Sequence, residues 1–275
     1  MSEQEEMRRR YRDFPDRDKW VNEAFFGLSQ VAPLLEKIAG GGRVLEVGSG
    51  TGILLNIISR RYPQLRIEGI EPVGEGFQIV DAYHRALPPS LKLHKCGYED
   101  FCAEDGRRYQ LIFAVNVFEH LHDWRHFLRF AHARLADDGR CVLLFPNYTF
   151  PYEPHFSLPI FFGKSLTHRL FRRAIEGYER AHGCAGYWNS LNFVTYMQVK
   201  KACARIGLAH EFDTKILREM LGRMATDAAY RERQKRLSVI AAVVKALYLD
   251  LPFNWGVLRN FTPYLKLELR RAEPA

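Results

Sequence analysis

The chain has 275 residues, 47% of them hydrophobic, which is enough for one large domain or for a core with a substantial insert. Its five cysteines are scattered and never form a C-x-x-C pair, which argues against a disulfide framework or a cysteine zinc site and favours reduced thiols. The net charge of +8 is compatible with nucleic acid, an anionic membrane or an acidic substrate as a partner, and equally with a diffusely charged surface.

Neither a signal peptide nor a membrane span is predicted. The first residues, MSEQEEMRRRYRDF, are charged throughout. The most apolar stretch, LSVIAAVVKALYLDLPF, is interrupted by Lys245 and Asp250 and falls short of the ~20 residues that a bilayer requires. We therefore expect a cytoplasmic protein, and peripheral association with a membrane stays open.

A helix is predicted ahead of the first strand. The segment WVNEAFFGLSQVAPLLEKIAGGG, residues 20–42, has apolar residues at helical spacing and ends in glycines. It should pack on the sheet that follows, so we assign residues 1–42 to an N-terminal helical segment.

Strand and helix patterns alternate through residues 43–147, the predicted core. Strands are expected at RVLEVG, LRIEGIEP, LKLHKC, YQLIFAVNV and GRCVLLFPN, the last of them entered through the turn ADDGR. Helices are expected at GILLNIISRRYP, GEGFQIVDAYHRAL and WRHFLRFAHARLA. Strands separated by helices of this length imply right-handed crossovers and a mostly parallel sheet.

The pattern changes after Asn147. Residues 148–192 are rich in aromatic residues and prolines around a basic helix, and residues 216–262 are irregular. Between these two inserts we expect a helix (TYMQVKKACARIGL) and a sixth strand (AHEFDTK), so that residues 193–275 complete the core. YLKLELRR predicts a last strand that is antiparallel and lies at an edge, because its two faces alternate.

The fold class is therefore α/β, a doubly wound and mostly parallel seven-stranded sheet with an antiparallel last strand. Helical inserts stand before and after strand six. Both inserts should lie near the carboxyl ends of the strands, where open α/β sheets bind ligands.

The segment VLEVGSGTGILL predicts a strand, a glycine turn and a helix. Glycines permit the tight turn and let a ligand approach the backbone closely. A dinucleotide fingerprint would need a third glycine at Ile53, and a phosphate loop would need a Gly-Lys-Ser/Thr sequence. Since Glu46 would also repel a phosphate, the turn favours a ligand that is poor in phosphate and can itself be cationic.

VLEVGSGTG, EGIEP, YQLIFAVNVFEHLHD and FPN together resemble a class I S-adenosylmethionine-dependent methyltransferase, in particular its ubiquinone-type and small-molecule branch. The resemblance covers roughly residues 25–150 and 193–270. It implies a Rossmann-like fold with a cofactor-binding core at residues 43–147. The residues that hold the methionine end of S-adenosylmethionine in this family match Glu46, Gly48, Ser49, Gly50 and Gly52.

The acidic residue that binds both ribose hydroxyls in the family matches Glu71, which comes 19 residues after Gly52 and precedes Pro72. One carboxylate can accept hydrogen bonds from two hydroxyls. The sulfonium and ammonium groups of this cofactor also suit nearby carboxylates, and the resemblance places Asn116 at the cofactor as well.

The third element, HKCGYEDF, falls where the family contacts adenine. Many relatives carry an aspartate at the position of Gly97. We therefore expect Tyr98 and Glu99 to contact adenine, through backbone amides among other groups.

Methyl transfer is an in-line displacement, so the protein has to align the nucleophile at about 3 Å and to remove a proton where the acceptor requires it. The candidate bases are Glu119 and His120 in NVFEH and His155 in PYEPHF, where two prolines fix the backbone. A capping or packing role for His120, and a hydrogen bond within its own loop for His155, are the alternatives.

The same turn raises the question of a metal. In ubiquinone-type O-methyltransferases and small-RNA 2′-O-methyltransferases, a Glu-x-x-Glu-His motif at this place binds a divalent ion. Here the first glutamate is Asn116, and the later histidine of the RNA enzymes has no match in GYWNSLNFVTY. We therefore expect no metal, although Glu119, His120 and His155 could still form a three-ligand site.

The inserts are expected to serve the acceptor. Tyr148, Tyr152 and Phe156 of the first insert suggest a lid over a flat or apolar acceptor, or else a small core of the insert itself. Residues 231–262 join a basic run to an apolar stretch, which could contact an anionic membrane, pack on the sheet or form a dimer contact.

Three functions are compatible with these patterns. The first is transfer of a methyl group to an oxygen, in preference to a nitrogen, of a small or medium acceptor such as a phenolic or quinone-like compound, a sugar or a lipid-linked glycan. The second is RNA 2′-O-methylation, which the net charge favours and the lack of an RNA-binding motif disfavours. The third is a non-catalytic binding protein, against which the glycine turn and Glu71 speak.

Overall fold

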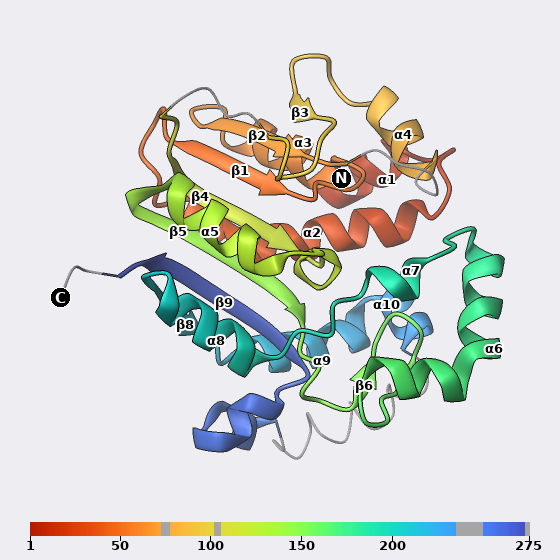
Figure 1. Ribbon diagram of the computed structural model, residues 1–275. Helices are drawn as coiled ribbons and strands as arrows, with labels where there is room; N and C mark the ends of the chain where they lie inside the picture. The colour runs from red at the N-terminus through yellow and green to blue at the C-terminus, as the bar shows by residue number, and fades with distance from the viewer. Residues whose placement is uncertain (73–77, 102–105, 235–249, 273–275) are drawn as a thin grey trace.

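A seven-stranded sheet forms the centre of the molecule (Figure 1), in the order β3-β2-β1-β4-β5-β9-β8. The computed structural model describes residues 1–72, 78–101, 106–234 and 250–272. Neighbours among the first five strands of the chain pair in parallel. The strands are β1 (Arg43–Val47), β2 (Arg66–Ile70), β3 (Lys92–His94), β4 (Tyr109–Val115), β5 (Leu135–Pro146), β8 (Leu208–Phe212) and β9 (Tyr264–Arg271).

The last strand, β9, is antiparallel as expected, but the prediction that it lies at an edge was wrong. It pairs with β5 on one side and with β8 on the other. Its alternation reflects one face that carries the charged side chains of Lys266, Glu268 and Arg270, of which Lys266 is buried, Glu268 half-buried and Arg270 exposed. Lys266, only 8% exposed, pairs with Asp213 at 3.0 Å. The alternation of polar and apolar residues in β9 thus indicated that one face of the strand is polar. It did not indicate that the strand lacks a neighbour on one side.

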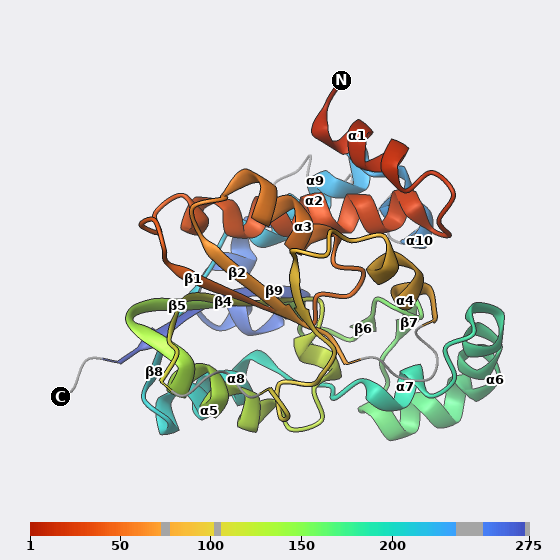
Figure 2. The same ribbon diagram turned by 90° about the horizontal axis from the view of Figure 1, so that it is seen from above.

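Helices cover both faces of the sheet (Figure 2). On one face lie α1 (Glu3–Arg10), α2 (Arg17–Leu35) and α3 (Ile53–Arg61), and on the other lie α5 (Trp124–Arg134) and α8 (Tyr196–Arg205). The helix α4 (Gln78–Arg85) follows β2. Apolar side chains from the helices on each face pack with the sheet in a separate cluster, which confirms the doubly wound arrangement.

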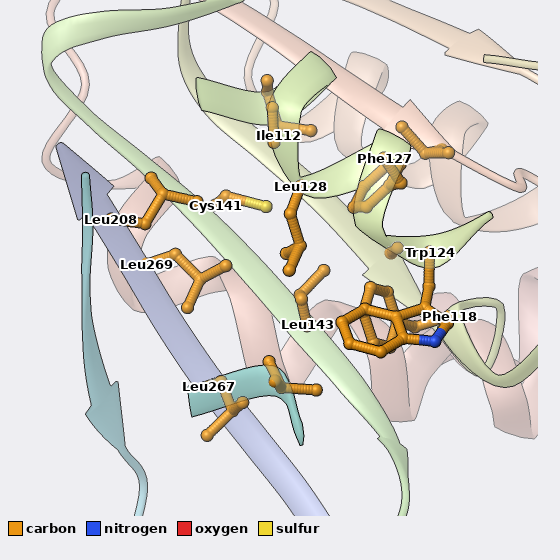
Figure 3. Close-up of a cluster of buried hydrophobic side chains, with 14 of the residues drawn as sticks. Ile112, Phe118, Trp124, Phe127, Leu128, Cys141, Leu143, Leu208, Leu267 and Leu269 are labelled. Atoms are coloured by element: carbon orange, nitrogen blue, oxygen red, sulfur yellow. The ribbon is translucent and has the colours of Figure 1, made fainter. Parts of the chain in front are cut away.

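The cluster between the sheet and α5 fixes the turn that follows β4 (Figure 3). That turn is a short 3₁₀ helix, η1 (Phe118–His120). The Phe118 ring is fully buried, and its centroid lies 4.8 Å from that of Phe145 and 5.9 Å from that of Trp124. Because this anchor is rigid, the backbone of Glu119 and His120 has a fixed position.

The start of β5 differs from the turn expected at ADDGR. Leu135 already pairs with Tyr109 of β4, and the next pair in register is Arg140 with Leu111. Residues 136–139 therefore stand opposite Gln110 alone and bulge out of the ladder.

The first insert has a small core of its own. It contains β6 (Tyr152–Glu153), β7 (Leu158–Pro159), α6 (Lys164–His182) and α7 (Tyr187–Ser190), which lie together at one end of the sheet (Figure 1). Its buried apolar residues are Phe156, Leu158, Ile175, Trp188 and Leu191.

The second insert contains α9 (Ile216–Thr226), α10 (Ala228–Arg233) and the 3₁₀ helices η2 (Leu251–Asn254) and η3 (Gly256–Phe261). The membrane contact expected through residues 231–262 falls partly outside the described residues, which leave out 235–249. Within the described part of the chain, none of the helices has the length and hydropathy needed to cross a membrane.

Asn147 holds together the segments that meet at the end of β5. This residue is 1% exposed, and its Nδ2 donates to the carbonyl oxygens of Asn260 and Thr262, each at 2.8 Å. Its Oδ1 accepts from the backbone N–H groups of Thr149 and Tyr196, at 3.2 and 3.1 Å. One side chain thus joins the first insert, the second insert and the start of α8.

Replacing Asn147 with Ala should lower the free energy of unfolding by about 2–4 kcal/mol, because buried backbone groups lose their partners. Asn189→Ala is the control, since Asn189 is exposed, and it should change stability by less than about 0.5 kcal/mol. Urea denaturation of both variants measures the difference. Equal stability of the two variants would show that water replaces the lost hydrogen bonds.

Candidate active site

The glycine turn after β1 crosses the end of β2. Gly48 and Ser49 donate their backbone N–H groups to the carbonyl oxygen of Ile70, at 2.9 and 3.1 Å. Gly48 and Gly50 have φ angles of 71° and 51°, in the left-handed region that favours glycine. The turn therefore stays close to the sheet until Gly52, after which α3 begins.

Two buried carboxylates lie beside this turn. Glu46 is 4% exposed and Glu71 is 8% exposed. Glu71 Oε2 accepts a hydrogen bond from Gly50 N at 2.8 Å, whereas Glu46 Oε2 has no hydrogen-bond partner among the described residues. Burial raises the pKa of Glu71 to about 7 and raises the pKa of Glu46 well above its usual range. A cation bound beside them would favour their charged forms.

His84 of α4 belongs to the same site and was missed in the sequence. Its Nε2 lies 2.7 Å from the carbonyl oxygen of Gly50. Both backbone polar groups of Gly50 are therefore held, the N–H by Glu71 and the carbonyl by His84. Burial lowers the pKa of His84, as expected for a neutral imidazole that donates from Nε2. No local pattern marks this histidine, since only the packing of α4 brings it to the turn.

The two residues expected at adenine face different surroundings. The side chain of Tyr98 is 4% exposed, donates its hydroxyl to Asp123 O at 2.8 Å and packs edge-on against Phe127. It belongs to the core, so only its backbone can contact a ligand. Glu99 is exposed. The Tyr98 ring is thus occupied in the core, and the contact of backbone groups here with adenine stays a prediction.

Asn116 and Pro72 stand at the ends of β4 and β2. Pro72 is exposed. Asn116 has a φ angle of 57°, and its Nδ2 donates to Glu23 Oε2 at 3.5 Å. Glu23 in turn pairs with Arg223 of α9 at 2.9 Å. The end of β4 is thus connected through α2 to the second insert.

A second polar cluster follows β4. Glu119 and His120 of η1 meet His155 of the first insert, and one potential ligand atom of each residue lies within 4.8 Å of the others. His155 Nε2 lies 3.7 Å from Glu119 Oε1, and the ring centroids of the two histidines are 5.3 Å apart. The structure thus brings together the three residues that the sequence offered as base or ligand.

This cluster adjoins the glycine turn. A Cβ atom on Gly48 would lie 2.3 Å from Cγ2 of Val117, two residues before Glu119. The two polar groups therefore stand at the neighbouring carboxyl ends of β1 and β4, which pair in parallel. Open α/β sheets bind their ligands at this edge.

Burial shapes the charge of the cluster. Glu119 is fully buried, and within the part of the chain that the structure describes neither of its carboxylate oxygens has a hydrogen-bond partner. Burial raises the pKa of Glu119 to about 7, and His155 opposes that rise. Burial, followed by the charge of His155, lowers the pKa of His120 to about 3. His120 is therefore neutral near pH 7.

Glu153 supports His155 and was also missed in the sequence. It is fully buried, and its Oε1 lies 2.6 Å from His155 Nδ1 and accepts the backbone N–H of the same residue at 3.1 Å. Its Oε2 accepts the backbone N–H of Phe156 at 2.6 Å. The signal was present in PYEPHF, where an acid stands two residues before the histidine, but only the turn after β6 makes them partners.

His120 has its own supporting contacts. Its Nδ1 lies 2.9 Å from Ser190 Oγ, and that hydroxyl donates its proton to Tyr187 O at 2.8 Å. Ser190 Oγ therefore accepts from His120 Nδ1–H, which leaves the lone pair on Nε2. The Tyr187 ring stacks on His120 with centroids 5.1 Å apart.

The residues predicted to form a lid are used in the packing of the inserts. Tyr148 stacks on Phe193 with centroids 4.3 Å apart, and Phe156 packs edge-on against Trp188 at 5.4 Å. Tyr152 donates its hydroxyl to Gln234 Oε1 at 3.1 Å. These contacts match the alternative of an insert core, and a lid over the acceptor stays a prediction.

The comparison with protein families shows the family to which the chain belongs. The model described as a methyltransferase domain matches residues 7–209. The chain belongs to this methyltransferase family. With the sheet order described above, it is a class I S-adenosylmethionine-dependent methyltransferase.

Similar proteins agree with this assignment. The uncharacterized protein Rv1509 of Mycobacterium tuberculosis is 34% identical over 232 residues, which are 82% of this chain and 78% of that protein. The solved structure of the plantazolicin methyltransferase BpumL has a TM-score of 0.54 at 12% identity and covers 98% of this chain and 96% of its own. The cyclopropane synthase MmaA2 from Mycobacterium tuberculosis has a TM-score of 0.50 at 15% identity, with 88% and 82% covered. At such identities the likeness shows the fold.

S-adenosylmethionine is the cofactor of this methyltransferase, and the glycine turn fits it. Glu46 has an oxygen without a hydrogen-bond partner among the described residues, and the pKa of Glu71 is raised, so a cationic ligand would stabilise both buried carboxylates in their charged forms. The backbone at Gly50 is open, since a Cβ atom there would meet no heavy atom within 4 Å.

On the expectation that Glu71 accepts both ribose hydroxyls, changing it to Ala should weaken S-adenosylmethionine binding about 100-fold or more, because two hydrogen bonds to a charged group would be lost. In the wild type the affinity should rise about tenfold from about pH 6 to about pH 7.5, as a carboxyl with a pKa of about 7 ionises. Titration calorimetry across this pH range, with Glu71→Gln as the matched variant, measures both effects. A wild-type slope that Glu71→Gln retains would assign the proton to another group.

Gly48 and Gly50 form a matched pair for alanine substitution. Gly48→Ala should lower the melting temperature more than Gly50→Ala does. Both changes strain the backbone, but only the Cβ atom at position 48 would also clash with Val117. Gly50→Ala has space for the methyl group, so it should fold with a loss of about 1–2 kcal/mol and yet bind the cofactor poorly. Thermal melts and calorimetry separate the two outcomes. Normal cofactor affinity in Gly50→Ala would place the ligand elsewhere.

Proposed function

We propose that this enzyme transfers the methyl group of S-adenosylmethionine to an oxygen of a small or medium acceptor. Phenolic or quinone-like compounds, sugars and lipid-linked glycans are the acceptor classes. The observation that carries the proposal is the pairing of His155 with the buried carboxylate of Glu153, 2.6 Å apart, within the cluster beside the glycine turn. Glu119 and His120 complete the group that meets the acceptor.

The contact with Glu153 sets the tautomer of His155. A carboxylate accepts the Nδ1 proton, so the lone pair of the imidazole lies on Nε2. That lone pair can receive a hydroxyl proton, and Glu153 would stabilise the imidazolium that results. When bound, the cofactor supplies an activated methyl group, and the protein has to provide alignment and removal of this proton.

The presence of a proton acceptor favours oxygen over nitrogen. A neutral amine already offers a lone pair before it attacks, whereas a hydroxyl becomes a good nucleophile as its proton leaves. An imidazole fixed by a buried carboxylate therefore suits a hydroxyl acceptor.

On the cofactor side, we assign Glu46, Ser49 and the turn glycines to the methionine end and Glu71 to the ribose. The burial of both carboxylates supports this assignment. His84 acts through Gly50, whose carbonyl it holds, and is therefore a positioning residue.

Changing His155 to Gln should slow methyl transfer about 10²–10⁴-fold, the range for loss of a general base, with cofactor binding unchanged. His122 is exposed and stands two residues after His120 in the sequence. The variant His122→Gln is therefore the control and should keep the wild-type rate. The assay follows a labelled methyl group from S-adenosylmethionine into panels of phenolic, sugar and glycan-lipid acceptors, and into RNA. Label found only in RNA or on nitrogen would contradict the proposal.

A further inference from the structure

Glu119 carries a buried carboxylate that the described part of the chain does not compensate. The residue is 0% exposed, and neither of its carboxylate oxygens accepts a hydrogen bond from another described residue. Burying a carboxylate without hydrogen bonds or a cation is costly. Because this one lies at the edge where open α/β sheets bind their ligands, a positively charged ligand can supply the missing partner.

A single imidazole stands beside two carboxylates here. His155 Nε2 lies 3.7 Å from Glu119 Oε1, and His155 Nδ1 lies 2.6 Å from Glu153 Oε1. Glu153 is also fully buried. Among the residues that the structure describes, Glu119 and Glu153 form ion pairs with His155 and with no lysine or arginine. Even a protonated His155 would therefore balance only one of the two carboxylates.

The other ionisable side chains that face Glu119 add no positive charge. Burial lowers the pKa of His120 to about 3, so this imidazole is neutral near pH 7. Burial also raises the pKa of three phenols, and the charge of the Glu119 carboxylate adds to each rise; these phenols belong to Tyr148, Tyr187 and Tyr264. The carboxylate thus faces neutral rings from η1, from the first insert and from β9.

The turn that carries Glu119 adjoins the glycine turn expected to hold the methionine end of S-adenosylmethionine. A Cβ atom on Gly48 would lie 2.3 Å from Cγ2 of Val117, two residues before Glu119. Transfer in line requires the methyl group and its sulfur to face the acceptor. The proposed function, on which this step rests, brings the acceptor to the cluster that contains Glu119. The sulfonium would then face the same carboxylate.

We propose that Glu119 makes this enzyme prefer S-adenosylmethionine over its product, S-adenosylhomocysteine. The two molecules differ by one methyl group and by the positive charge of the sulfonium. A carboxylate that is shielded from water attracts such a charge more strongly than an exposed one does. Glu119 is therefore a specificity-determining residue on the cofactor side.

The reaction itself removes the charge that Glu119 attracts. As the methyl group bonds to the acceptor oxygen, the bond between sulfur and methyl carbon breaks and leaves its electron pair on sulfur. The hydroxyl proton of the acceptor passes to the base. Because the sulfur is then a neutral thioether, its attraction to the carboxylate is lost and the product dissociates more readily than the substrate form.

The preference can be measured without an acceptor. At pH 8 a carboxyl with a pKa of about 7 is ionised. In titration calorimetry the wild type should then bind S-adenosylmethionine about 10–100-fold more tightly than S-adenosylhomocysteine. Glu119→Gln keeps the shape of the side chain and removes its charge, so the preference should fall below about threefold while the affinity for the product stays the same. Sinefungin, which carries an amine in place of the methylated sulfur, should follow S-adenosylmethionine in both proteins.

Two further variants and a thermal melt separate charge from structure. Glu71→Gln, at the expected ribose contact, should weaken both ligands alike, because both contain the ribose. Glu36→Gln is the matched control, since Glu36 is exposed and directly follows α2, and it should change neither affinity. The melting temperature of ligand-free Glu119→Gln should equal or exceed that of the wild type, because a buried charge without a hydrogen-bond partner is removed.

The results of these titrations are distinct from those that test the proposed function. A wild type that binds S-adenosylhomocysteine as tightly as S-adenosylmethionine would overturn the inference, whatever the stability of the variants. An unchanged preference in Glu119→Gln would overturn it as well. Neither result bears on transfer to oxygen, which the labelled methyl group reports. Label found only on nitrogen or in RNA would contradict the proposed function, whereas a preference that depends on Glu119 would still support this inference.

Discussion

The exclusion of water from carboxylates is the constraint on which the site depends. Glu46, Glu71, Glu119 and Glu153 are all at most 8% exposed, and they gather where β1, β2, β4 and β5 end. Burying a carboxylate is unfavourable unless hydrogen bonds or cations compensate. Among the described residues this compensation is incomplete, because oxygens of Glu46 and Glu119 have no hydrogen-bond partner there. A cationic ligand beside the glycine turn would supply part of the missing compensation.

The core gives these carboxylates their fixed positions. Val47 and Ile70 are buried at the ends of β1 and β2, directly before the polar residues that follow. Phe118 does the same for η1, because its ring is locked among Phe145 and Trp124. Asn192 adds a clamp by donating its backbone N–H to Glu119 O at 2.7 Å. Carboxylates held in this way cannot relax toward water, which keeps the pKa values of Glu46, Glu71 and Glu119 raised.

The inserts contribute more to the site than a covering. The turn that carries His155 is supported by Gln234, whose Nε2 donates to Pro154 O at 3.0 Å and whose Oε1 accepts from Tyr152. Gln234 directly follows α10, so the second insert supports the histidine of the first. The three aromatic residues that were predicted to form a lid pack within the inserts instead: Phe156 lies in the core of the first insert, Tyr148 stacks on Phe193, and Tyr152 bonds to Gln234.

The sequence by itself determined the parallel core, the glycine turn and the spacing of Glu71, because each depends on residues within one strand–turn–helix unit. It also placed Glu119 and His120 at the end of β4. The tertiary structure alone decided that β9 lies inside the sheet, since strand order depends on partners far apart in the chain. It likewise decided the roles of His84, Glu153 and Ser190, whose partners are set by packing between elements or by a local turn. A sequence pattern records which side chains an element carries, and their meeting in space depends on how the elements pack.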